Sequence, residues 1–584
     1  MKRKRHELAI LATDAYKLFH SAAYPEGTTS VYSNMTPRHN SYFEYDDHYV
    51  AVGTEMFIER FLINFWNERF FNLPVEEVVE DFNAITKGGG LSTGLNETHV
   101  RELHDLGYLP LEIKSLPEGT YAKVGIPMLT VENTDDRFYW LTNFIETQLL
   151  SEMFPVFNSS TIARQYKKIA LEWSTKTCDN NFHIPWQFHD FSRRGQHGND
   201  AGTTTALGHL TSFMGTDSIQ GALMVDNYYQ GNTENGSVYG SVMATEHSVA
   251  SSYGLDGEKE YFKSLLEKFP DGILSMVSDT YDYWNVLENV LPQLKDEIMS
   301  RNGKLVLRPD SGKIIDVICG KRIHDIDLSK LKDGETLKDK EWEIEQIARD
   351  QAFDDCEGAH NCGNEEYEVI LKTKEGHFSV SVEFEYSRHD KTYYYVEESE
   401  VNWDTLKKLD VNDSEIKGTL NILWDTFGGT INEKGYKVLD PRIGLIYGDS
   451  VNLDNAGRIF EAMESIGFAS SNVVLGVGAY SYSYQNSRDM LATAFKTTSV
   501  VINGVEKSVQ KDPKTDSRKS SAKGRLAVSK HVDGHLVLHQ ELSKEDRLAL
   551  RGYDLLQPVF RNGERLGFTD FERIRDRIEQ SIKL

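Results

Sequence analysis

The spacing of apolar residues changes several times along the chain and predicts which segments are helices and which are strands. Phenylalanines recur at close to helical spacing between residues 54 and 71, which predicts an amphipathic helix. Residues 109–131 alternate in short runs broken by Pro-Glu-Gly and Gly-Ile-Pro, so we expect strands joined by turns there. Residues 138–153 are strongly apolar and predict a helix, and Ser159-Ser160 predicts the N-cap of another.

From about residue 160 the pattern becomes one of buried strands separated by helices. The expected strands are 273–277, 304–307, 444–447 and 472–477, and the expected helices are 284–299 and 453–466. Strands that alternate with helices favour a parallel sheet or a (β/α) barrel. In such barrels the active site lies at the C-terminal ends of the strands, so residues that follow these strands are candidates for function.

Residues 321–416 interrupt this alternation. The stretch is acidic, and its runs 367–371 and 378–386 alternate around Lys374-Glu375-Gly376, which predicts a β-hairpin. We interpret it as an inserted, mostly β module. An insertion of this length is tolerated because the entropy of closing a loop grows only slowly with its length.

Composition narrows the class of protein. A chain of 584 residues is too long for one ordinary core and suggests two or three domains. Its formal net charge of −26 argues against binding to nucleic acid or to an anionic membrane, although a few local Arg and Lys can still hold phosphate. Four cysteines are too sparse for a disulfide scaffold and fit a reducing cytoplasm, and no apolar run approaches the roughly 20 residues of a membrane span.

Four segments share one theme, in which a small or apolar stretch runs into an aspartate beside Ser or Thr. They are Gly215-Thr216-Asp217-Ser218, Val277-Ser278-Asp279-Thr280, Arg308-Pro309-Asp310-Ser311-Gly312 and Gly448-Asp449-Ser450. The last three follow predicted strands. Carboxylates at several strand ends, with an arginine fork at one of them, indicate a polar ligand that carries phosphate. The plainer interpretation of each segment is a strand-ending turn.

Other segments could complete such a site. Gly476-Val477-Gly478 is a glycine turn suited to phosphate, but it lacks the third glycine of a dinucleotide-binding motif. His247, ahead of a predicted helix, could act as a base or as a nucleophile toward a phosphoryl group. Phe191, close to Arg193-Arg194, could stack on a flat ring while the arginines bind an anion. A structural histidine and a solvated arginine pair remain the alternatives.

Two further patterns are weaker evidence of a functional site. The lysine-rich stretch 511–525 is either a solvated loop or a phosphate-binding loop. The cysteines and histidine of Cys356-x3-His360-x-Cys362 hint at a metal, but a structural zinc site needs four ligands and no second matched pair is nearby. Neither pattern identifies a site without further support.

Taken together, the motifs resemble the nicotinate/nicotinamide phosphoribosyltransferase family from Ala9 nearly to the C-terminus, apart from the insertion. The matching segments, in chain order, are Ala12–Lys17, Val131–Asp135, Tyr139–Asn143, His189–Phe191, Gly215–Asp217, Ala244–Ser248, Val277–Asp282, Arg308–Gly312, Gly448–Asp449, Ser487–Asp489, Phe495–Lys496, Lys511–Pro513 and Lys523–Leu526. The resemblance implies an α/β fold: an irregular (β/α) barrel of the type II phosphoribosyltransferase kind, with a second α+β domain built from both chain ends. The expected parts are 1–158 and 487–584 for the α+β domain, 159–320 and 417–486 for the barrel, and 321–416 for the β-rich insertion.

The resemblance also implies an activity. A phosphoribosyl group would pass from phosphoribosyl pyrophosphate to nicotinamide, giving nicotinamide mononucleotide and pyrophosphate in NAD salvage. Mg²⁺ would share the pyrophosphate charge, and ATP would be a coupled co-substrate that phosphorylates His247. The implied assembly is a homodimer with active sites at the subunit boundary. The ligands of the metal stay unknown.

The family resemblance also implies a role for individual residues of this sequence. Phe191 and the partner subunit's Tyr16 would sandwich the pyridine ring, and Asp217 would accept from the carboxamide NH₂ and repel the carboxylate of nicotinate. The implied catalytic residues are His247, Asp279 and Asp310, with Asp279 placed to orient His247. The implied nicotinamide contacts are Phe191, Tyr16, Asp217 and Arg308. The ribose and 5′-phosphate contacts are Asp310, Gly448, Asp449, Gly478, Ala479 and Arg488. The pyrophosphate contacts are Arg194, His247, Arg308, Lys496 and Lys511. Further site residues are Asp14, Arg38, Ser241, Val242, Glu246, Ser275 and Lys519.

Three positions depart from the family pattern. Gln187 stands where Lys is usual, Ala479 stands where a further Gly is usual in a loop one residue longer, and Ala494 replaces a Ser ahead of Lys496. These changes leave the pyridine and ribose groups intact and bear on phosphate affinity and ATP coupling. Three alternatives stay open: nicotinate as the substrate, an inactive relative that binds without catalysis, and a nucleotide-binding barrel of unrelated chemistry.

Overall fold

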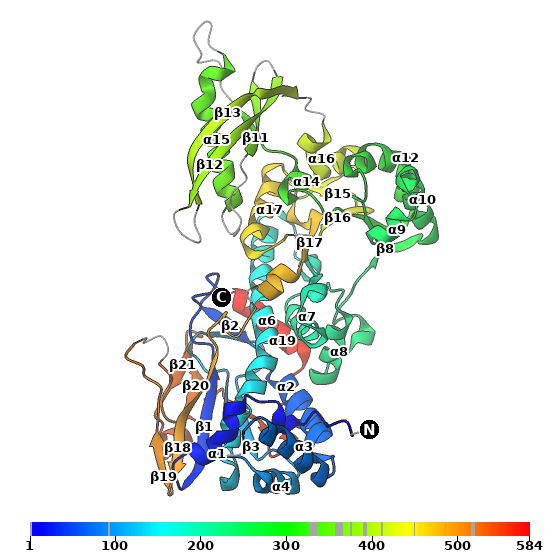
Figure 1. The fold of residues 1–584 in the computed structure, drawn as a ribbon. Coiled ribbons are helices and arrows are strands. Elements are labelled where there is room, and N and C mark those ends of the chain that lie inside the picture. The colour runs from blue at the N-terminus through cyan, green and yellow to red at the C-terminus, as the bar shows by residue number, and fades with distance from the viewer. Residues whose placement is uncertain are drawn as a thin grey trace. The chain divides into compact units, whose positions relative to one another are not determined.

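The computed structural model describes residues 3–91, 94–325, 336–356, 366–373, 376–388, 394–409, 413–448, 450–484, 486–515 and 520–583. The chain forms two compact units. The first comprises Met1–Lys168, His189–Ser241 and Gly478–Leu584, and the second comprises Ile169–Phe188 and Val242–Val477. Figure 1 shows the elements of both, and each unit is described by itself below.

Both ends of the chain build the main sheet of the first unit. Its order is β19-β18-β1-β5-β3-β22-β23. The strands are β1 (Thr28–Thr36), β3 (Leu111–Ser115), β5 (Leu129–Asn133), β18 (Ala494–Ile502), β19 (Val505–Ser508), β22 (Gln557–Arg561) and β23 (Glu564–Arg565). The antiparallel pairing of β1 with β18 joins residues more than 450 positions apart, from Thr28↔Ile502 to Thr36↔Ala494. Both chain ends therefore contribute strands to one sheet, as expected, and the same unit also contains His189–Ser241, a segment that the expected bounds placed in the barrel.

Helices and short strands surround this sheet. The predicted amphipathic helix at 54–71 is confirmed as α2 (Thr54–Phe57), which continues through π-helical stretches at Ile58–Phe65 and Asn67–Phe71. Further helices of the unit are α3 (Val75–Gly88), α4 (Glu97–Leu106), most of α6 (Glu146–Thr177), α7 (Asn199–Leu210), α8 (Ile219–Tyr228), α18 (Lys544–Leu550) and α19 (Phe571–Lys583). Two small antiparallel pairs complete it, β2 (His48–Ala51) with β4 (Thr120–Lys123), and β20 (Ala527–Lys530) with β21 (Leu536–His539).

One sequence prediction is wrong. The Ser159-Ser160 pair does not begin a helix, because α6 runs without a break from Glu146 to Thr177 with Pro155 inside it. Both serines are fully buried, and Ser159 Oγ donates to the carbonyl oxygens of Pro155 and Val156. A serine hydroxyl can donate to a carbonyl one turn earlier inside a helix, so its polarity does not require an N-cap.

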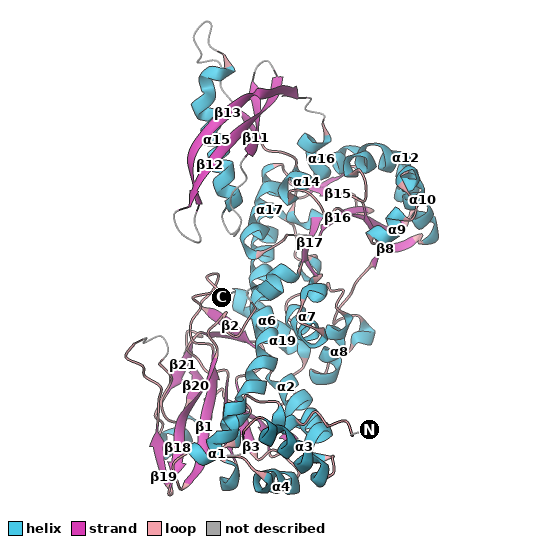
Figure 2. Ribbon diagram, in the orientation of Figure 1, coloured by secondary structure: helices cyan, strands magenta, loops and turns pink. Residues whose placement is uncertain are grey.

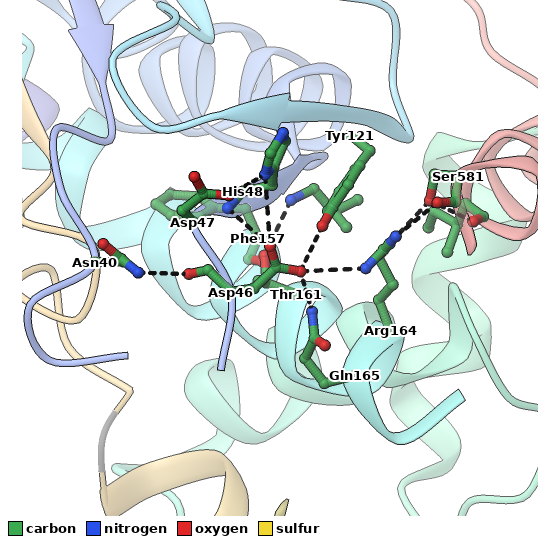
Figure 3. A network of polar contacts seen from close by, with 12 residues as sticks. Asn40, Asp46, Asp47, His48, Tyr121, Phe157, Thr161, Arg164, Gln165 and Ser581 are labelled. Atoms are coloured by element: carbon green, nitrogen blue, oxygen red, sulfur yellow. Dashed lines mark hydrogen bonds and ion pairs between the residues drawn. The ribbon is translucent and has the colours of Figure 1, made fainter. Parts of the chain in front are cut away.

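A buried polar network links β2, β4, α6 and α19 within the first unit (Figure 3). Asp46 Oδ2 accepts from the Tyr121 hydroxyl at 2.5 Å and from Arg164 at 3.3 Å. Arg164 also donates to the Ser581 hydroxyl and carbonyl oxygens at 2.8 Å each. Burial opposes ionisation of Asp46, but hydrogen bonds from His48 and Tyr121 and the positive Arg164 lower its pKa to about 2.

The second unit is built on a parallel sheet. The sheet order is β6-β17-β16-β9-β8-β7, and the neighbouring pairs from β17 to β7 are parallel. The strands are β6 (Phe188–Asp190), whose first residue belongs to this unit, β7 (Met243–Ala244), β8 (Asp271–Val277), β9 (Asn302–Arg308), β16 (Ile443–Tyr447) and β17 (Val473–Val477). The four strands predicted from buried runs are confirmed to within two residues, as is the parallel α/β class (Figure 2).

Helices connect these strands. The predicted helix at 284–299 is a chain of short helical pieces, α11 (Tyr283–Asn285), a π-helical stretch at Val286–Val290, α12 (Leu291–Gln293) and α13 (Lys295–Ser300). The predicted helix at 453–466 is α17 (Leu453–Ser465), which Asn452 caps by accepting from the backbone N–H groups of Asp454 and Asn455. The remaining connecting helices are α9 (His247–Ser251), α10 (Glu258–Lys268), α14 (Ile314–Cys319) and α16 (Ser414–Phe427).

The insertion has its own core. It contains β10 (Ile323–Asp325), β11 (Glu366–Thr373), β12 (Gly376–Arg388), β13 (Tyr394–Leu409) and α15 (Glu341–Cys356). The antiparallel pairing of β11 with β12 confirms the predicted hairpin. Ile344 and Ala348 of α15 are buried in one cluster with apolar residues of the three long strands, among them Val369, Val380 and Val401. In the Cys356, His360 and Cys362 pattern, the last two residues lie outside the described ranges.

The two ends of the insertion meet at one point. Lys321 N–H donates to Glu415 O at 3.0 Å. The backbones come so close that a Cβ added to Gly320 would lie 2.1 Å from Ile416 O, and one added to Gly418 would lie 2.0 Å from Gly320 N. Both glycines have positive φ angles, so side chains are excluded there by space and by backbone conformation. Within the described part of the chain, no helix is long and apolar enough to cross a membrane.

Candidate active site

His247 and Asp279 lie together at the C-terminal ends of strands in the second unit. His247 follows β7 and begins α9, and Asp279 follows β8. His247 Nδ1 is 3.0 Å from the Thr280 hydroxyl, and its Nε2 is 3.9 Å from Asp279 Oδ1. The imidazole is half exposed, whereas the Asp279 side chain is only 5% exposed. Among the described residues Asp279 Oδ1 accepts no hydrogen bond, so this carboxylate oxygen can serve the imidazole or its ligand.

Asp279 also shapes the turn after β9. Its Oδ2 accepts from Asp310 N–H at 2.9 Å and from the Ser311 hydroxyl at 2.6 Å. The Tyr447 hydroxyl, at the end of β16, donates to Ser311 O and Gly312 O at 3.0 and 2.8 Å. Gly312 has a φ of 91°, a conformation that favours glycine. The turn from Arg308 to Gly312 is therefore fixed from the strands on both sides of it.

Arg308 is the cation of this group. It is the last residue of β9, its side chain is 15% exposed, and its Nε lies 3.6 Å from Asp310 Oδ2. That Nε is buried and makes no hydrogen bond to any described residue. A buried charged donor without a hydrogen bond is costly, and the 3.6 Å ion pair with Asp310 satisfies it only in part, so the site is suited to an anionic ligand.

The other predicted residues of the second unit lie near the same strand ends. Ser275 is buried in β8, and its backbone carbonyl oxygen accepts from Thr245 N–H at 3.0 Å, which joins the end of β7 to β8. Glu246 accepts from the Ser248 hydroxyl at the start of α9. Val242 is exposed, and Gly448 follows β16. Asp449 lies outside the described residues.

A second group forms in the first unit around Asp217. A parallel bridge pairs Asp190 with Thr216, so the residues that follow them, Phe191 and Asp217, lie at one edge. The fully buried Asp190 holds this edge together, because its carboxylate accepts from Ser192 N–H and from the Thr216 hydroxyl at 2.9 Å each.

Two donors converge on one oxygen of Asp217. His189 Nε2 is 3.0 Å and the Ser241 hydroxyl is 2.6 Å from Asp217 Oδ1. The His189 ring also lies 4.7 Å from the ring of Phe191. A Cβ on Gly215 would come within 2.7 Å of His189 Nδ1, so glycine is needed there for the imidazole to fit. The result is a held carboxylate beside an aromatic face.

The departure at position 479 has a visible packing partner. A Cβ added to Gly195 would lie 2.2 Å from the Cβ of Ala479, and Ser483 Oγ donates to Gly195 O at 3.3 Å. The loop that carries Arg194 therefore packs directly on the loop of Gly478 and Ala479. Gln187 is also buried for a structural reason, because its side-chain amide donates to the carbonyl oxygens of Ser470 and Val473. Ala494 is buried opposite Thr36 in the β1–β18 pairing.

Tyr16 and Lys496 line a separate open cavity of about 390 Å³ in the first unit. Lys17 pairs with Glu146 at its wall, and Lys496 lies 3.8 Å from the same carboxylate. Burial lowers the pKa of Lys496, which the charge of Glu146 partly offsets. Tyr16 is 56% exposed although it is a large aromatic residue, so its ring is open to a ligand or to another chain.

Of the remaining predicted residues of the first unit, Arg38 and Lys511 lie near Lys496, because their positive charges contribute to its lowered pKa. Asp14 accepts from the Thr147 hydroxyl, and Arg38 Nε donates to Ala492 O. Arg488 pairs with the neighbouring Asp489 at 2.7 Å, and Lys511 is exposed. Lys519 lies outside the described residues.

Sequence reasoning missed the partners of the candidate site residues. Thr280, His189, Asp190 and Tyr447 were not among the predicted site residues. Thr280 and His189 contact His247 and Asp217, whereas Asp190 and Tyr447 bind Thr216 and Ser311, which lie next to Asp217 and Asp310. Three of the four lie inside segments that had been singled out, so immediate neighbours of a motif were the available signal. For Tyr447, the only signal in the sequence was its position next to Gly448 at the end of a predicted strand.

A parallel α/β sheet with a histidine, an arginine and carboxylates at its strand ends is the arrangement of an enzyme that handles a phosphorylated ligand. The model of the nicotinate phosphoribosyltransferase (NAPRTase) family matches residues 186–333 and 371–564, which is more than half of the chain. The chain belongs to the nicotinate phosphoribosyltransferase family.

Individual relatives extend the match to both ends. Nicotinamide phosphoribosyltransferase of Acinetobacter baylyi (strain ATCC 33305 / BD413 / ADP1) is 35% identical over 584 residues, which cover 98% of this chain and 97% of the relative. Nicotinamide phosphoribosyltransferase of Mycoplasma pneumoniae (strain ATCC 29342 / M129 / Subtype 1) is 29% identical over 549 residues, which cover 89% of this chain and 96% of the relative. Nicotinate-nucleotide pyrophosphorylase from Pyrococcus furiosus, a solved structure, aligns with 100% of this chain and 98% of its own at 13% identity and a TM-score of 0.49.

Proposed function

We propose that this chain is a nicotinamide phosphoribosyltransferase that makes nicotinamide mononucleotide and pyrophosphate from nicotinamide and phosphoribosyl pyrophosphate in NAD salvage. The observation that carries the proposal is the Asp217 carboxylate, held by His189 and Ser241 beside the ring of Phe191. Family membership supplies the reaction class, and this carboxylate supplies the choice of base.

The charge of Asp217 favours an amide over an acid. A carboxylate accepts a hydrogen bond from the NH₂ of nicotinamide, whereas the carboxylate of nicotinate would bring a second negative charge to the same place. Donation by His189 and Ser241 to Oδ1 stabilises the charged form and fixes the plane of the carboxylate. The Phe191 ring gives the pyridine a face to stack on.

The reaction places its largest demand on the leaving group. The bond from the ribose C1 to the pyrophosphate oxygen breaks with its electron pair on oxygen, and a bond from C1 to the pyridine nitrogen forms. Cations that meet the departing charge lower this barrier most. Arg308, whose buried Nε makes no hydrogen bond to a described residue, is proposed to bind phosphate, and Arg194, Lys496 and Lys511 are proposed to share the task. Asp310 is proposed to hold the ribose hydroxyls.

Mg²⁺ is proposed to come with the substrate. It takes oxygen ligands, keeps several waters and binds substrate phosphates through one or two carboxylates. The partly exposed carboxylate of Asp310 fits that requirement. When bound, the ion would neutralise charge on the pyrophosphate.

ATP coupling is proposed to run through His247. Its Nε2 would attack the γ-phosphorus of ATP, forming an N–P bond as the P–O bond breaks and ADP leaves. Donation from Nδ1–H to the Thr280 hydroxyl, 3.0 Å away, would leave the lone pair on Nε2. Asp279 Oδ1, 3.9 Å from Nε2, would stabilise the positive phosphoimidazole that results. The half-exposed ring is accessible to a nucleotide.

A homodimer is proposed to complete the pyridine site. Tyr16 is exposed on an open cavity in the first unit, where its ring is available to a second copy of the chain. A cytoplasmic location without membrane or nucleic-acid partners is proposed from the acidic charge and the few cysteines.

Steady-state rates with each base test the function. We expect pyrophosphate release from phosphoribosyl pyrophosphate to depend on added nicotinamide, and nicotinate to be a much poorer substrate. Higher catalytic efficiency with nicotinate would overturn the role of Asp217. Release that needs neither base would overturn the reaction itself.

A further inference from the structure

The turn between β20 and β21 carries a cluster of metal-ligating groups that the proposed reaction does not use. His531, Asp533 and His535 occupy alternate positions in this hairpin of the first unit. The Nδ1 atoms of His531 and His535 lie 2.9 and 2.5 Å from the same oxygen, Asp533 Oδ1. One ligand atom from each of the three side chains lies within 4.8 Å of the others.

The backbone of the turn places these groups on one side. His531 N–H donates to His535 O at 2.9 Å and Gly534 N–H donates to His531 O at 3.0 Å, which closes a tight hairpin. Gly534 supplies the positive φ of 95° that the turn needs. The two imidazole rings stack with their centroids 4.7 Å apart. The convergence of the three ligands is therefore built into the hairpin.

The donor set is that of a transition metal. Two imidazole nitrogens and one carboxylate suit Zn²⁺, Co²⁺ or Ni²⁺, whereas Mg²⁺ prefers oxygen ligands alone. Metal–ligand bonds of about 2.0–2.1 Å in a tetrahedral shell place neighbouring ligand atoms about 3.3 Å apart. The two Nδ1 atoms are closer than this to Asp533 Oδ1, so the side chains need to move apart only slightly to reach that distance. The side chains are 51–59% exposed, so an ion has free access and water can fill the fourth position.

A second cluster of similar composition differs from the hairpin in the groups that surround its ligand atoms. Asp46, Asp47 and His48 also bring three ligand atoms together. There, however, Asp46 already accepts from Tyr121 and Arg164, and the positive guanidinium opposes a cation (Figure 3). In the hairpin turn, by contrast, Asp533 Oδ1 is approached by the two imidazoles and by the His535 N–H at 3.2 Å, and no arginine or lysine is paired with Asp533 among the described residues.

We propose that His531, Asp533 and His535 form a binding site for one divalent transition-metal ion of the Zn²⁺ class. The ion replaces the two protons that the imidazoles would otherwise share with Asp533. It ties the ends of β20 and β21 across the turn and so stabilises the hairpin. This site is separate from the Mg²⁺ proposed for the substrate.

Titration of the chelator-treated full-length protein with Co²⁺ tests the site, because tetrahedral Co²⁺ has a visible absorption spectrum. The chain holds 18 histidines, so the measurement is a comparison with the double variant His531→Ala/His535→Ala. The matched control is Val532→Ala, which changes a 98% exposed side chain between the two ligands and removes no donor. Added Zn²⁺ should displace the Co²⁺ and abolish the absorption.

We expect the wild type and Val532→Ala to bind one more Co²⁺ per chain than the double variant. We also expect Asp533→Asn alone to weaken the affinity by about tenfold or more, since even indirect supports of a metal site cost 10–100-fold. The same number of ions bound with the same affinity in the wild type and the double variant would overturn the proposal. Circular dichroism of each variant checks that the fold is retained.

Discussion

Replacing Asp217 by Asn is the sharpest test of how the base is chosen. The change removes one negative charge but keeps the size of the side chain and one carbonyl oxygen. His189 and Ser241 can still donate to that oxygen, so the local geometry is retained. The new amide group can donate to a carboxylate. We therefore expect the variant to lose preference for nicotinamide and to accept nicotinate more readily.

The magnitude follows from the charge and its exposure. Two like charges about 4 Å apart repel by about 1 kcal/mol in water and by about 4 kcal/mol at the effective dielectric of a protein surface. The Asp217 side chain is 47% exposed, so a value near the lower end, about 1–2 kcal/mol, is appropriate. That corresponds to a change of about 5- to 30-fold in the ratio of kcat/KM values for the two bases.

The assay is steady-state pyrophosphate release with each base at saturating phosphoribosyl pyrophosphate. The matched control is Asp136→Asn, which removes a charge from the exposed surface of the same unit. An Asp217→Asn enzyme whose ratio of kcat/KM values stays within about twofold of the wild type would refute the electrostatic argument. An equal change in the control would assign the effect to net charge instead.

Three further predictions address other parts of the molecule. Asp279→Asn removes the charge 3.9 Å from His247 Nε2, so we expect at least about tenfold less acid-labile phosphate after incubation with labelled ATP; full labelling would contradict the role of Asp279. Asp46→Asn should lower the stability of the first unit by about 1–2 kcal/mol near pH 7. Folding lowers the pKa of Asp46 from its ordinary value of 3.8 to about 2, so the stability difference between wild type and variant is fully present above pH 3.8 and disappears as the pH falls toward 2. Hydrogen exchange in α6 measures this difference, and a difference that grows as the pH falls would contradict the prediction. Replacing residues 322–414 by a short Gly-Ser linker should leave a folded protein by circular dichroism, and aggregation of that variant would show that the insertion shares a core with the rest.

Regular elements with one periodicity could be predicted from the sequence, and elements whose shape depends on distant residues could not. The strands of the parallel sheet are short buried runs, so 273–277 and 444–447 could be placed from their composition. The length of α6 could not, because Pro155 and two serines suggest a break that tertiary packing overrides. Likewise, nothing local signals that β1 pairs with β18 across more than 450 residues.

The candidate site shows the same division. Residues with distinctive chemistry at strand ends, such as Arg308 and His247, could be singled out from the sequence. Their orientation could not, because it depends on hydrogen bonds to other strands. The contact of Asp279 with the backbone of Asp310 depends on the register of β8 against β9, in which Val277 pairs with Arg308. The resemblance to a family, rather than periodicity, linked the residues of the two units.

The meeting of the two insertion ends at Gly320 and Gly418 has a consequence for how this chain can change over evolutionary time. Because the chain leaves the end of α14 and enters α16 at one point, the module can be gained, lost or exchanged in a single recombination event without rerouting any strand of the parallel sheet. Residues 321–416 hold 26 acidic and 13 basic side chains, which is half of the net charge of −26. A relative without the module would therefore keep the sheet and its strand-end residues but differ sharply in isoelectric point and in the pH at which it is least soluble.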